Sequence, residues 1–229
     1  MFGTGNKILQ YIRRSLFSAQ WYNLRSIRPV SEIFGLERGV PIDRYYIEKF
    51  LKENDRYIQG NVLEIAESTY SKKFGKNIES FEVLHYNNEN PNATIIGDLT
   101  KTDTLPDNKI DCFICTQTFQ FIYNFKDAIY GSHHLLKENG ILLATFAGIS
   151  QISRYDMDRW GDYWRFTTLS ATKAFEEIFG EGHVKVDYYG NVLSAVAILE
   201  GIASEELSYE ELDHRDHNYQ VLITVVAKK

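Results

Sequence analysis

Short apolar runs rich in β-branched residues alternate with longer helical stretches from about residue 60 onward. The runs that we predict to be strands cover residues 62–65, 81–85, 93–96, 110–115 and 141–146. Helical periodicity covers residues 42–54, and a second helix is predicted over residues 126–137, ended by Asn139 and Gly140. Strands that alternate with helices in this way favour a mainly parallel sheet with helices on both faces.

The C-terminal part of the chain follows a different pattern. Residues 184–189 and 220–227 both predict strands, and an apolar helix over residues 191–201 and an acidic stretch through Asp216 lie between them. We expect a closing antiparallel pair here. The predicted fold class is therefore α/β, with a seven-stranded, mostly parallel sheet, which differs from the all-parallel six-stranded dinucleotide-binding fold.

Composition excludes several classes of protein. The 229 residues, 44% of them hydrophobic, provide ample core for one domain, and no linker-like or repeated segment divides the chain. The net charge of −6 gives no general attraction to nucleic acid. No run approaches the ~18 to 20 apolar residues needed to span a bilayer, and two cysteines make no disulfide scaffold. We expect a soluble, cytoplasmic protein.

The N-terminal segment differs from the rest in charge, and we predict a basic helical extension over residues 1–40 before a domain over residues 41–229. The first 31 residues contain no acid, so the remaining chain carries a charge of −11. Their basic side chains are Lys7, Arg13, Arg14, Arg25 and Arg28. Leu9, Ile12 and Leu16 fall on one helical face, so a helix here either packs on the domain or rests on an anionic membrane surface or a partner.

Four segments fall at or beside predicted strands, where an open α/β sheet binds its ligands. They are EIAESTY (64–70), GDL (97–99), LPD (105–107) leading into IDCFI (110–114), and LKENGILL (136–143). Their order and spacing, over roughly residues 40–229, resemble the class I S-adenosylmethionine-dependent methyltransferases, in which an acidic residue on the first strand precedes a glycine-rich turn. The resemblance implies a methyltransferase that uses S-adenosylmethionine as its cofactor.

The resemblance also implies which residues contact that cofactor. Glu64 takes the place of the acid at the first turn, Asp98 that of the adenine acceptor, and Gln117 follows the fourth strand. The complete set is Glu64, Ala66, Tyr70, His85, Asp98, Leu99 and Gln117. The chain departs from the family in two places: Ala66, Ser68 and Tyr70 replace the usual glycines, and the second strand lacks the terminal acid, which leaves His85 or Asn87 to bind the ribose.

Charged and aromatic residues are interleaved over residues 154–167. Aromatic faces stack on sugar rings, and Asp and Arg side chains bind hydroxyls or phosphate. The segment DYWRFT (162–167) is similar to one in methyltransferases of cell-surface glycan biosynthesis, including versions joined to glycosyltransferases. This similarity implies O-methylation of a sugar in a surface glycan or its lipid- or nucleotide-linked precursor, a glycosyltransferase partner, and substrate contacts by Tyr163, Trp164 and Arg165. The alternative is a structural brace in which Arg165 pairs with Asp162 or Asp158.

Methyl transfer to a hydroxyl needs precise positioning and a group that takes the proton. We predict Asp162 as this base and Asp158 as the second candidate, ahead of His133 and His134, which lie inside a predicted helix. Two other functions stay open. The first is a catalytically silent binding or scaffold module of the same fold, and the second is a methyltransferase that acts on a small molecule or a protein.

No metal site is predicted. Cys112 and Cys115 have CxxC spacing, but residues i and i+3 of a strand point to opposite faces, so we predict two separate core thiols. His214 and His217 lack further ligands nearby and are expected in an acidic surface loop.

Overall fold

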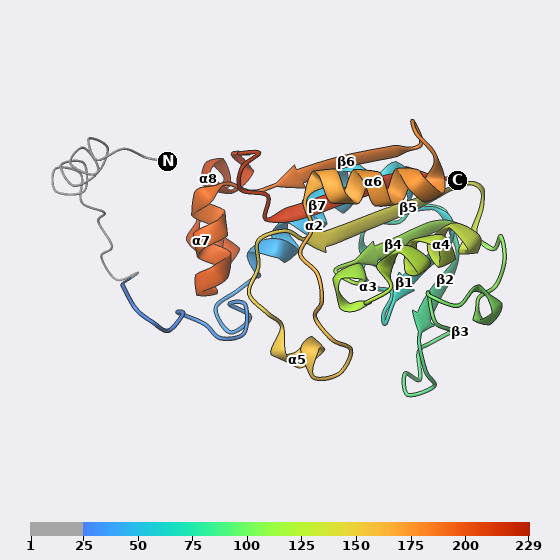
Figure 1. The fold of residues 1–229 in the computed structure, drawn as a ribbon, viewed down its shortest axis with the longest axis horizontal. Helices are drawn as coiled ribbons and strands as arrows, with labels where there is room; N and C mark the ends of the chain where they lie inside the picture. The colour runs from blue at the N-terminus through green and yellow to red at the C-terminus, as the bar shows by residue number, and fades with distance from the viewer. Residues whose placement is uncertain (1–24) are drawn as a thin grey trace, which may run out of the picture.

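The computed structural model describes residues 25–229, which form one seven-stranded sheet covered by helices (Figure 1). The strand order is β3-β2-β1-β4-β5-β7-β6. The strands are β1 (Gly60–Ile65), β2 (Ile78–His85), β3 (Ile95–Ile96), β4 (Ile110–Thr116), β5 (Leu136–Ala147), β6 (Val184–Tyr189) and β7 (Leu222–Lys228). Strands β1 to β5 run parallel, and β7 lies antiparallel between β5 and β6. The predicted fold class, including the antiparallel ending, is confirmed.

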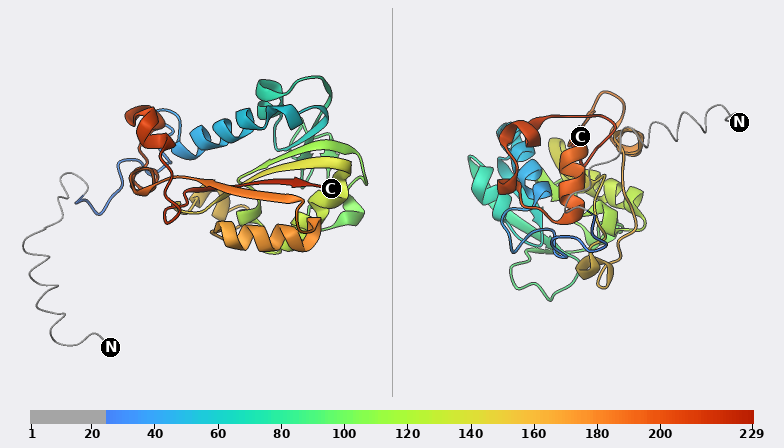
Figure 2. Two further views of the ribbon diagram at one scale, coloured as in Figure 1. Left: turned by 90° about the horizontal axis from the view of Figure 1, so that it is seen from above. Right: turned by 90° about the vertical axis from the view of Figure 1, so that its left-hand side faces the viewer.

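The helices form a layer on each face of the sheet (Figure 2, left). Their bounds are α2 (Ile42–Glu53), α3 (Thr69–Phe74), α4 (Phe125–Leu135), α5 (Arg154–Met157), α6 (Thr168–Phe179), α7 (Val192–Glu200) and α8 (Tyr209–Asp213). Helices α4 and α6 bury their apolar side chains in one core, and α2 and α7 bury theirs in the other. Cys115 lies in the first core and Cys112 in the second, so the prediction that they face opposite sides is confirmed.

One helix boundary and the longest of the helices that were not predicted correct the sequence-based prediction. The helix predicted over residues 126–137 ends at Leu135, because Leu136 already pairs with Ile110 as the first residue of β5. Asn139 then adopts a left-handed conformation (φ 66°) within an irregular start of that strand. Helix α6 is absent from the sequence-based prediction, although Thr167 and Ser170 form a capping box at its N-terminus.

Residues 25–40, which we call the strap, run along the end of the domain without regular helix or strand. The Ser31 N–H donates to the Glu200 carbonyl at 2.9 Å, and the guanidinium of Arg38 binds both oxygens of Glu206 at 2.9 and 2.5 Å. These contacts hold the strap to the C-terminal end of α7 and the turn after it. The helical face predicted from Leu9, Ile12 and Leu16 lies outside the described residues, and the division at residue 40 stays a prediction.

None of the helices within residues 25–229 has the length and apolar character needed to cross a membrane.

Candidate functional site

A cavity of about 1150 Å³ lies at the carboxyl ends of the parallel strands. Its walls come from the loops after β1, β2, β3, β4 and β5, and the strap contributes residues from Glu32 to Leu36. The strand order reverses between β1 and β4, so the cavity is at the edge where open α/β sheets bind ligands. Small-molecule pockets usually measure roughly 300–1,000 Å³. This cavity therefore has room for more than one small ligand.

Glu64 supports the first loop instead of lining the cavity. Its carboxylate is 97% buried and accepts hydrogen bonds from the backbone N–H groups of Tyr70 and Ser71, at 3.0 and 2.7 Å, and from the Ser71 hydroxyl. Burial raises the pKa of Glu64, and the bonds from Ser71 and Tyr70 oppose that rise. Glu64 thus fixes the start of α3, and its predicted contact with the cofactor stays a prediction.

Ala66 adopts the backbone conformation that the replaced glycine would favour. Its φ of 66° lies in the left-handed region, so the loop keeps a glycine-like turn at the cost of some strain. The ring of Tyr70 lies parallel to that of Phe74, with centroids 6.4 Å apart, and packs beside the core under α2. Ala66 and Tyr70 both line the cavity, and the Tyr70 ring leaves it open.

His85, at the end of β2, lines the cavity and is half-buried. Its Nδ1 lies 3.0 Å from the Asn87 carbonyl oxygen and 3.4 Å from the Asn87 backbone nitrogen. The other ring nitrogen, Nε2, has no hydrogen-bond partner among the described residues. The sequence-based assignment of His85 to the ribose stays a prediction.

Asp98 and Leu99 line the cavity after β3, and their predicted contact with the cofactor stays a prediction. Partial burial tends to raise the pKa of Asp98, but hydrogen bonds from Thr100 and the nearby Lys101 outweigh it and hold the pKa below its usual value. The Thr100 N–H and hydroxyl donate to one carboxylate oxygen, Oδ1, at 2.9 and 2.7 Å. Asp98 is therefore an ionised acceptor, and among the described residues its other oxygen has Lys101 as its one polar partner, at 3.4 Å.

Gln117 follows β4 at the point where the strand order reverses, with φ of 48°. Its side-chain oxygen accepts a hydrogen bond from the Gln120 amide at 2.6 Å, and both residues line the cavity. Gln120 is 98% buried, and within the described part of the chain its own Oε1 has no hydrogen-bond partner. The sequence analysis missed Gln120, although it follows the same strand end by only four residues.

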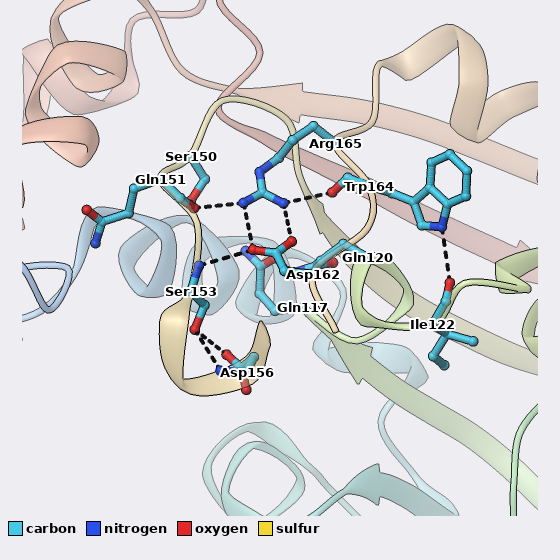
Figure 3. A network of polar contacts seen from close by, with 10 residues as sticks. All are labelled: Gln117, Gln120, Ile122, Ser150, Gln151, Ser153, Asp156, Asp162, Trp164 and Arg165. Atoms are coloured by element: carbon cyan, nitrogen blue, oxygen red, sulfur yellow. Dashed lines mark hydrogen bonds and ion pairs between the residues drawn. The ribbon is translucent and has the colours of Figure 1, made fainter. Parts of the chain in front are cut away.

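Asp162 lies at the centre of a polar network in the loop between β5 and α6 (Figure 3). Its side chain is fully buried, and its two oxygens accept from the Arg165 guanidinium at 2.5 and 3.0 Å. The Ser153 N–H also donates to Asp162, at 3.1 Å. Arg165 further donates to the carbonyl of Gln151 at 2.7 Å. The structural brace that the sequence left open as an alternative therefore exists.

Two other residues of this loop lie away from the cavity wall. Asp158 is exposed and pairs with Arg154 at 2.9 Å, one turn earlier. The Trp164 indole N–H donates to the Ile122 carbonyl at 3.2 Å, and its ring packs against Phe125. The structure thus separates Trp164 from Tyr163 and Arg165, which do line the cavity, because alternate residues of an extended segment point to opposite sides.

Several cavity residues have no counterpart in the sequence analysis. Arg44 on α2 makes no ion pair with the described residues, and Asp156, Tyr155 and Trp160 come from the loop that contains Asp162. The strap residues were missed because the charge and the helical face of the N-terminal segment gave no sign of a contact with the cavity. Tyr155, Asp156 and Trp160 fall within residues 154–167. The interleaved charged and aromatic residues of that segment could therefore have identified them as cavity residues.

The histidines and cysteines give no second site. His133 packs its ring against Phe179, 5.0 Å between centroids, and His134 lies 3.4 Å from Asp107, so both belong to α4 and its surroundings. No cluster of ligating side chains that would hold a metal ion occurs within residues 25–229.

Residues 49–144 match a family model described as "Methyltransferase domain". This match covers β1 to β5 up to Ala144, and with them the loops that build one side of the cavity. Residues 49–144 are a methyltransferase domain. With the seven-stranded sheet that surrounds this segment, the chain has the fold of the class I S-adenosylmethionine-dependent methyltransferases.

Solved structures with the same fold are distant in sequence. One from Archaeoglobus fulgidus, described as a SAM-dependent methyltransferase, is 14% identical, with 81% of this chain and 94% of that chain covered and a TM-score of 0.52. A possible histamine N-methyltransferase from Thermotoga maritima is 13% identical, with coverages of 82% and 91% and a TM-score of 0.53. The plantazolicin methyltransferase BamL, solved in complex with a triazolic desmethylPZN analog and S-adenosylhomocysteine, is 14% identical, with coverages of 95% and 94% and a TM-score of 0.51. A comparison with curated protein sequences finds no match.

The cavity of this methyltransferase fits S-adenosylmethionine. The loop after β1 keeps its turn despite lacking glycine, and Tyr70 packs toward Phe74 and leaves the space in front of that loop open. Asp98 supplies an ionised acceptor for an amino group, and His85 a ring nitrogen for a hydroxyl. These are the kinds of group that an adenosine requires.

Proposed function

We propose that this methyltransferase methylates a sugar hydroxyl in a surface glycan or in its lipid- or nucleotide-linked precursor. The observation that carries the proposal is the aromatic lining of the cavity on the side of the β5–α6 loop. Tyr123, Tyr155 and Tyr163 line this side and are 65%, 66% and 48% exposed. Flat faces beside polar groups suit sugar rings, which are apolar on their faces and polar at their edges.

The residues divide into a cofactor side and an acceptor side. Asp98 and His85 are proposed to bind the adenosine, and the Gln117–Gln120 pair lies after β4 between the two sides. Tyr155 and Tyr163 are proposed to hold the sugar ring. When bound, S-adenosylmethionine supplies an electrophilic methyl group on a positively charged sulfur. The chain's own contribution is then to align the acceptor oxygen and to remove its proton.

The proton acceptor is proposed among the carboxylates of residues 154–162. Asp162, the sequence-based candidate, has both oxygens bound by Arg165, so it takes a proton only if that ion pair opens. Asp156 lines the same cavity, and its Oδ1 accepts no hydrogen bond from the described residues, while Oδ2 accepts from the Ser153 hydroxyl at 2.6 Å. We therefore favour Asp156 over Asp162, and Asp158 less than either because it lies outside the cavity wall.

A glycosyltransferase partner and a lipid contact of residues 1–31 are part of this proposal. Their support is the sequence similarity of residues 162–167 and the basic charge of the N-terminal segment. A lipid-linked acceptor would bring both together, because its sugar is built at a membrane surface.

The proposal is tested by transfer from radiolabelled S-adenosylmethionine to a panel of methyl glycosides, nucleotide sugars and, for comparison, histamine and a peptide mixture. We expect label in a glycoside or nucleotide sugar, and at least a tenfold loss of it in Tyr163→Ala. Tyr209→Ala, which removes an exposed ring on α8, is the matched control. Label only in the amine or the peptides would replace the sugar with a small-molecule or protein acceptor. Absence of S-adenosylhomocysteine binding in calorimetry would favour the silent module.

A further inference from the structure

A side pocket of about 410 Å³ opens beside the main cavity, between the loop after β2 and helix α5. Its walls are formed by His85, Tyr86, Glu89, Asn90, Tyr155, Arg159 and Trp160. All of these residues except Glu89 and Asn90 also line the main cavity, so the two spaces share a wall.

Aromatic rings dominate the shared wall. Trp160 meets Tyr86 edge to face, with centroids 5.0 Å apart, and lies 6.2 Å from His85 in a similar geometry. Tyr86, Tyr155 and Trp160 are nevertheless 57%, 66% and 39% exposed. Apolar surface gathered in this way at one concave place usually marks a binding site.

The charged side chains of the side pocket select among ligands. The Glu89 carboxylate makes no ion pair with the described residues, and neither does the Arg159 guanidinium. Arg159 is held in place by its position over the Tyr155 ring, 3.5 Å from the centroid, and by its bond to the Tyr155 carbonyl at 2.8 Å. The opposite charges of Arg159 and Glu89 give the pocket no net preference for a cationic or an anionic ligand. A neutral ligand with several hydroxyls can donate to the one and accept from the other.

The remaining polar side chain already has a structural role. The Asn90 amide donates to the Ala66 carbonyl at 2.7 Å, and its oxygen accepts from the Asn92 N–H at 3.0 Å. Asn90 thereby ties the β2–β3 loop to the turn after β1. The groups free to bind a ligand are therefore the aromatic rings, Glu89 and Arg159.

We propose that the side pocket binds a second sugar ring of the acceptor, next to the ring that is methylated in the main cavity. This inference rests on the proposed function, and it narrows the acceptor to a disaccharide or longer glycan. Stacking on Trp160 would supply most of the affinity, and Glu89 and Arg159 would bind ring hydroxyls. A monosaccharide would leave the side pocket empty and would bind more weakly.

The experiment measures saturation-transfer NMR of sugars on the protein loaded with S-adenosylhomocysteine. The probes are methyl glycosides of glucose, mannose, rhamnose and N-acetylglucosamine and disaccharides made from them. We expect at least one disaccharide to bind the wild type at least fivefold more tightly than its monosaccharide. Trp160→Ala should remove that difference, and Arg159→Gln should reduce it. Affinity for S-adenosylhomocysteine should stay within twofold in both variants.

Tyr130→Ala, which removes a ring 58% exposed on α4, is the control that should leave all sugar binding unchanged. Equal binding of the disaccharides by wild type and Trp160→Ala would overturn the side-pocket inference and leave the proposed function standing. A more than threefold loss of S-adenosylhomocysteine affinity in Trp160→Ala would also overturn it, because the Trp160 ring would then belong to the cofactor site. If no glycoside binds the wild type, both the inference and the proposed function are wrong.

Discussion

The Arg165 guanidinium binds both carboxylate oxygens of Asp162, and this ion pair organises the loop between β5 and α6. Arg165 also donates to the Gln151 carbonyl, and Asp162 accepts from the Ser153 N–H, so the two ends of the loop are joined through one buried carboxylate (Figure 3). Such a two-point ion pair fixes geometry as well as charge. Tyr155 and Tyr163, which line the cavity, belong to the same loop.

We expect Asp162→Asn to lower the free energy of unfolding by about 2 kcal/mol, because it leaves Arg165 without a counter-charge beside a buried amide. Asp158→Asn removes an exposed ion pair with Arg154 and should change the free energy of unfolding by less than about 0.5 kcal/mol. Urea denaturation of the two variants measures the difference. Equal stabilities would show that the Asp162–Arg165 pair does not hold the loop.

The same loop distinguishes the two candidate bases. At a temperature where every variant is folded, Asp156→Asn should reduce turnover at least 100-fold and leave affinity for S-adenosylhomocysteine unchanged. Arg165→Gln leaves Asp162 free to accept a proton, so it should keep more turnover than Asp156→Asn. Wild-type turnover in Asp156→Asn, with loss in Asp162→Asn, would return the role to Asp162.

Asp98 should dominate the binding of the adenosine. Its replacement by Ala removes an ionised, partly buried acceptor, and we expect a loss of S-adenosylhomocysteine affinity of about 1–3 kcal/mol, roughly 10- to 100-fold. Asp103→Ala, an exposed acid in the same loop that does not line the cavity, is the control. Unchanged calorimetric affinity in Asp98→Ala would remove this residue from the site.

The turn after β1 carries strain that a single substitution relieves. Ala66 has φ of 66°, so Ala66→Gly should raise the free energy of unfolding by up to about 1 kcal/mol. Ala93→Gly, in a loop where alanine has an ordinary φ, should lower it instead, since glycine adds freedom to the unfolded chain. Thermal denaturation measures both. A destabilised Ala66→Gly would mean that the methyl group contributes packing that outweighs the strain.

The sequence predicted the sheet well because each strand is a short apolar run bounded by turn residues. Strand β6 was predicted to the residue, β1 and β2 were located with only their N-terminal ends underestimated, and β4 was predicted one residue short at its C-terminal end. The pattern of apolar residues cannot show where a helix ends when the next strand follows without a break. This is the case between Leu135 and Leu136, where the pairing of Leu136 with Ile110 decides the boundary.

The candidate site was predictable where residues follow a strand directly, as Asp98, Leu99 and Gln117 do. It was not predictable where the role of a residue depends on its partner. Glu64 and Asp162 have the right chemistry for a site, but their oxygens are taken by Ser71 and Arg165. Strap residues such as Phe34 reach the cavity only through the contacts that residues far along the chain provide.

The two cysteines should resist modification while the protein is folded. Both are fully buried, and burial raises the pKa of each thiol, that of Cys115 to about 12. Thiolate, the reactive form, is therefore scarce and inaccessible. A thiol-reactive disulfide reagent should label neither residue in the native protein and both in denaturant. Rapid labelling of one cysteine without unfolding would show that its core opens locally.

The attachment of the strap should depend on pH through Glu206. Its hydrogen bonds with Arg38 lower the pKa of this carboxyl to about 2, and the backbone bond from Ala203 adds to the effect. A carboxyl whose pKa is lowered by folding stabilises the folded state above its ordinary value, near 4.5, and this contribution is lost as the pH falls toward about 2. Hydrogen exchange of residues 30–38, corrected for intrinsic rates, should show constant protection from pH 7 to pH 5 and a progressive loss below. Glu206→Gln should show reduced protection already at pH 7, whereas Glu210→Gln, an exposed acid of α8 that makes no ion pair with the described residues, should behave as the wild type. If Glu206→Gln protects the strap as well as the wild type at pH 7, the backbone contacts of Ser31 and Val40 hold the strap without the ion pair.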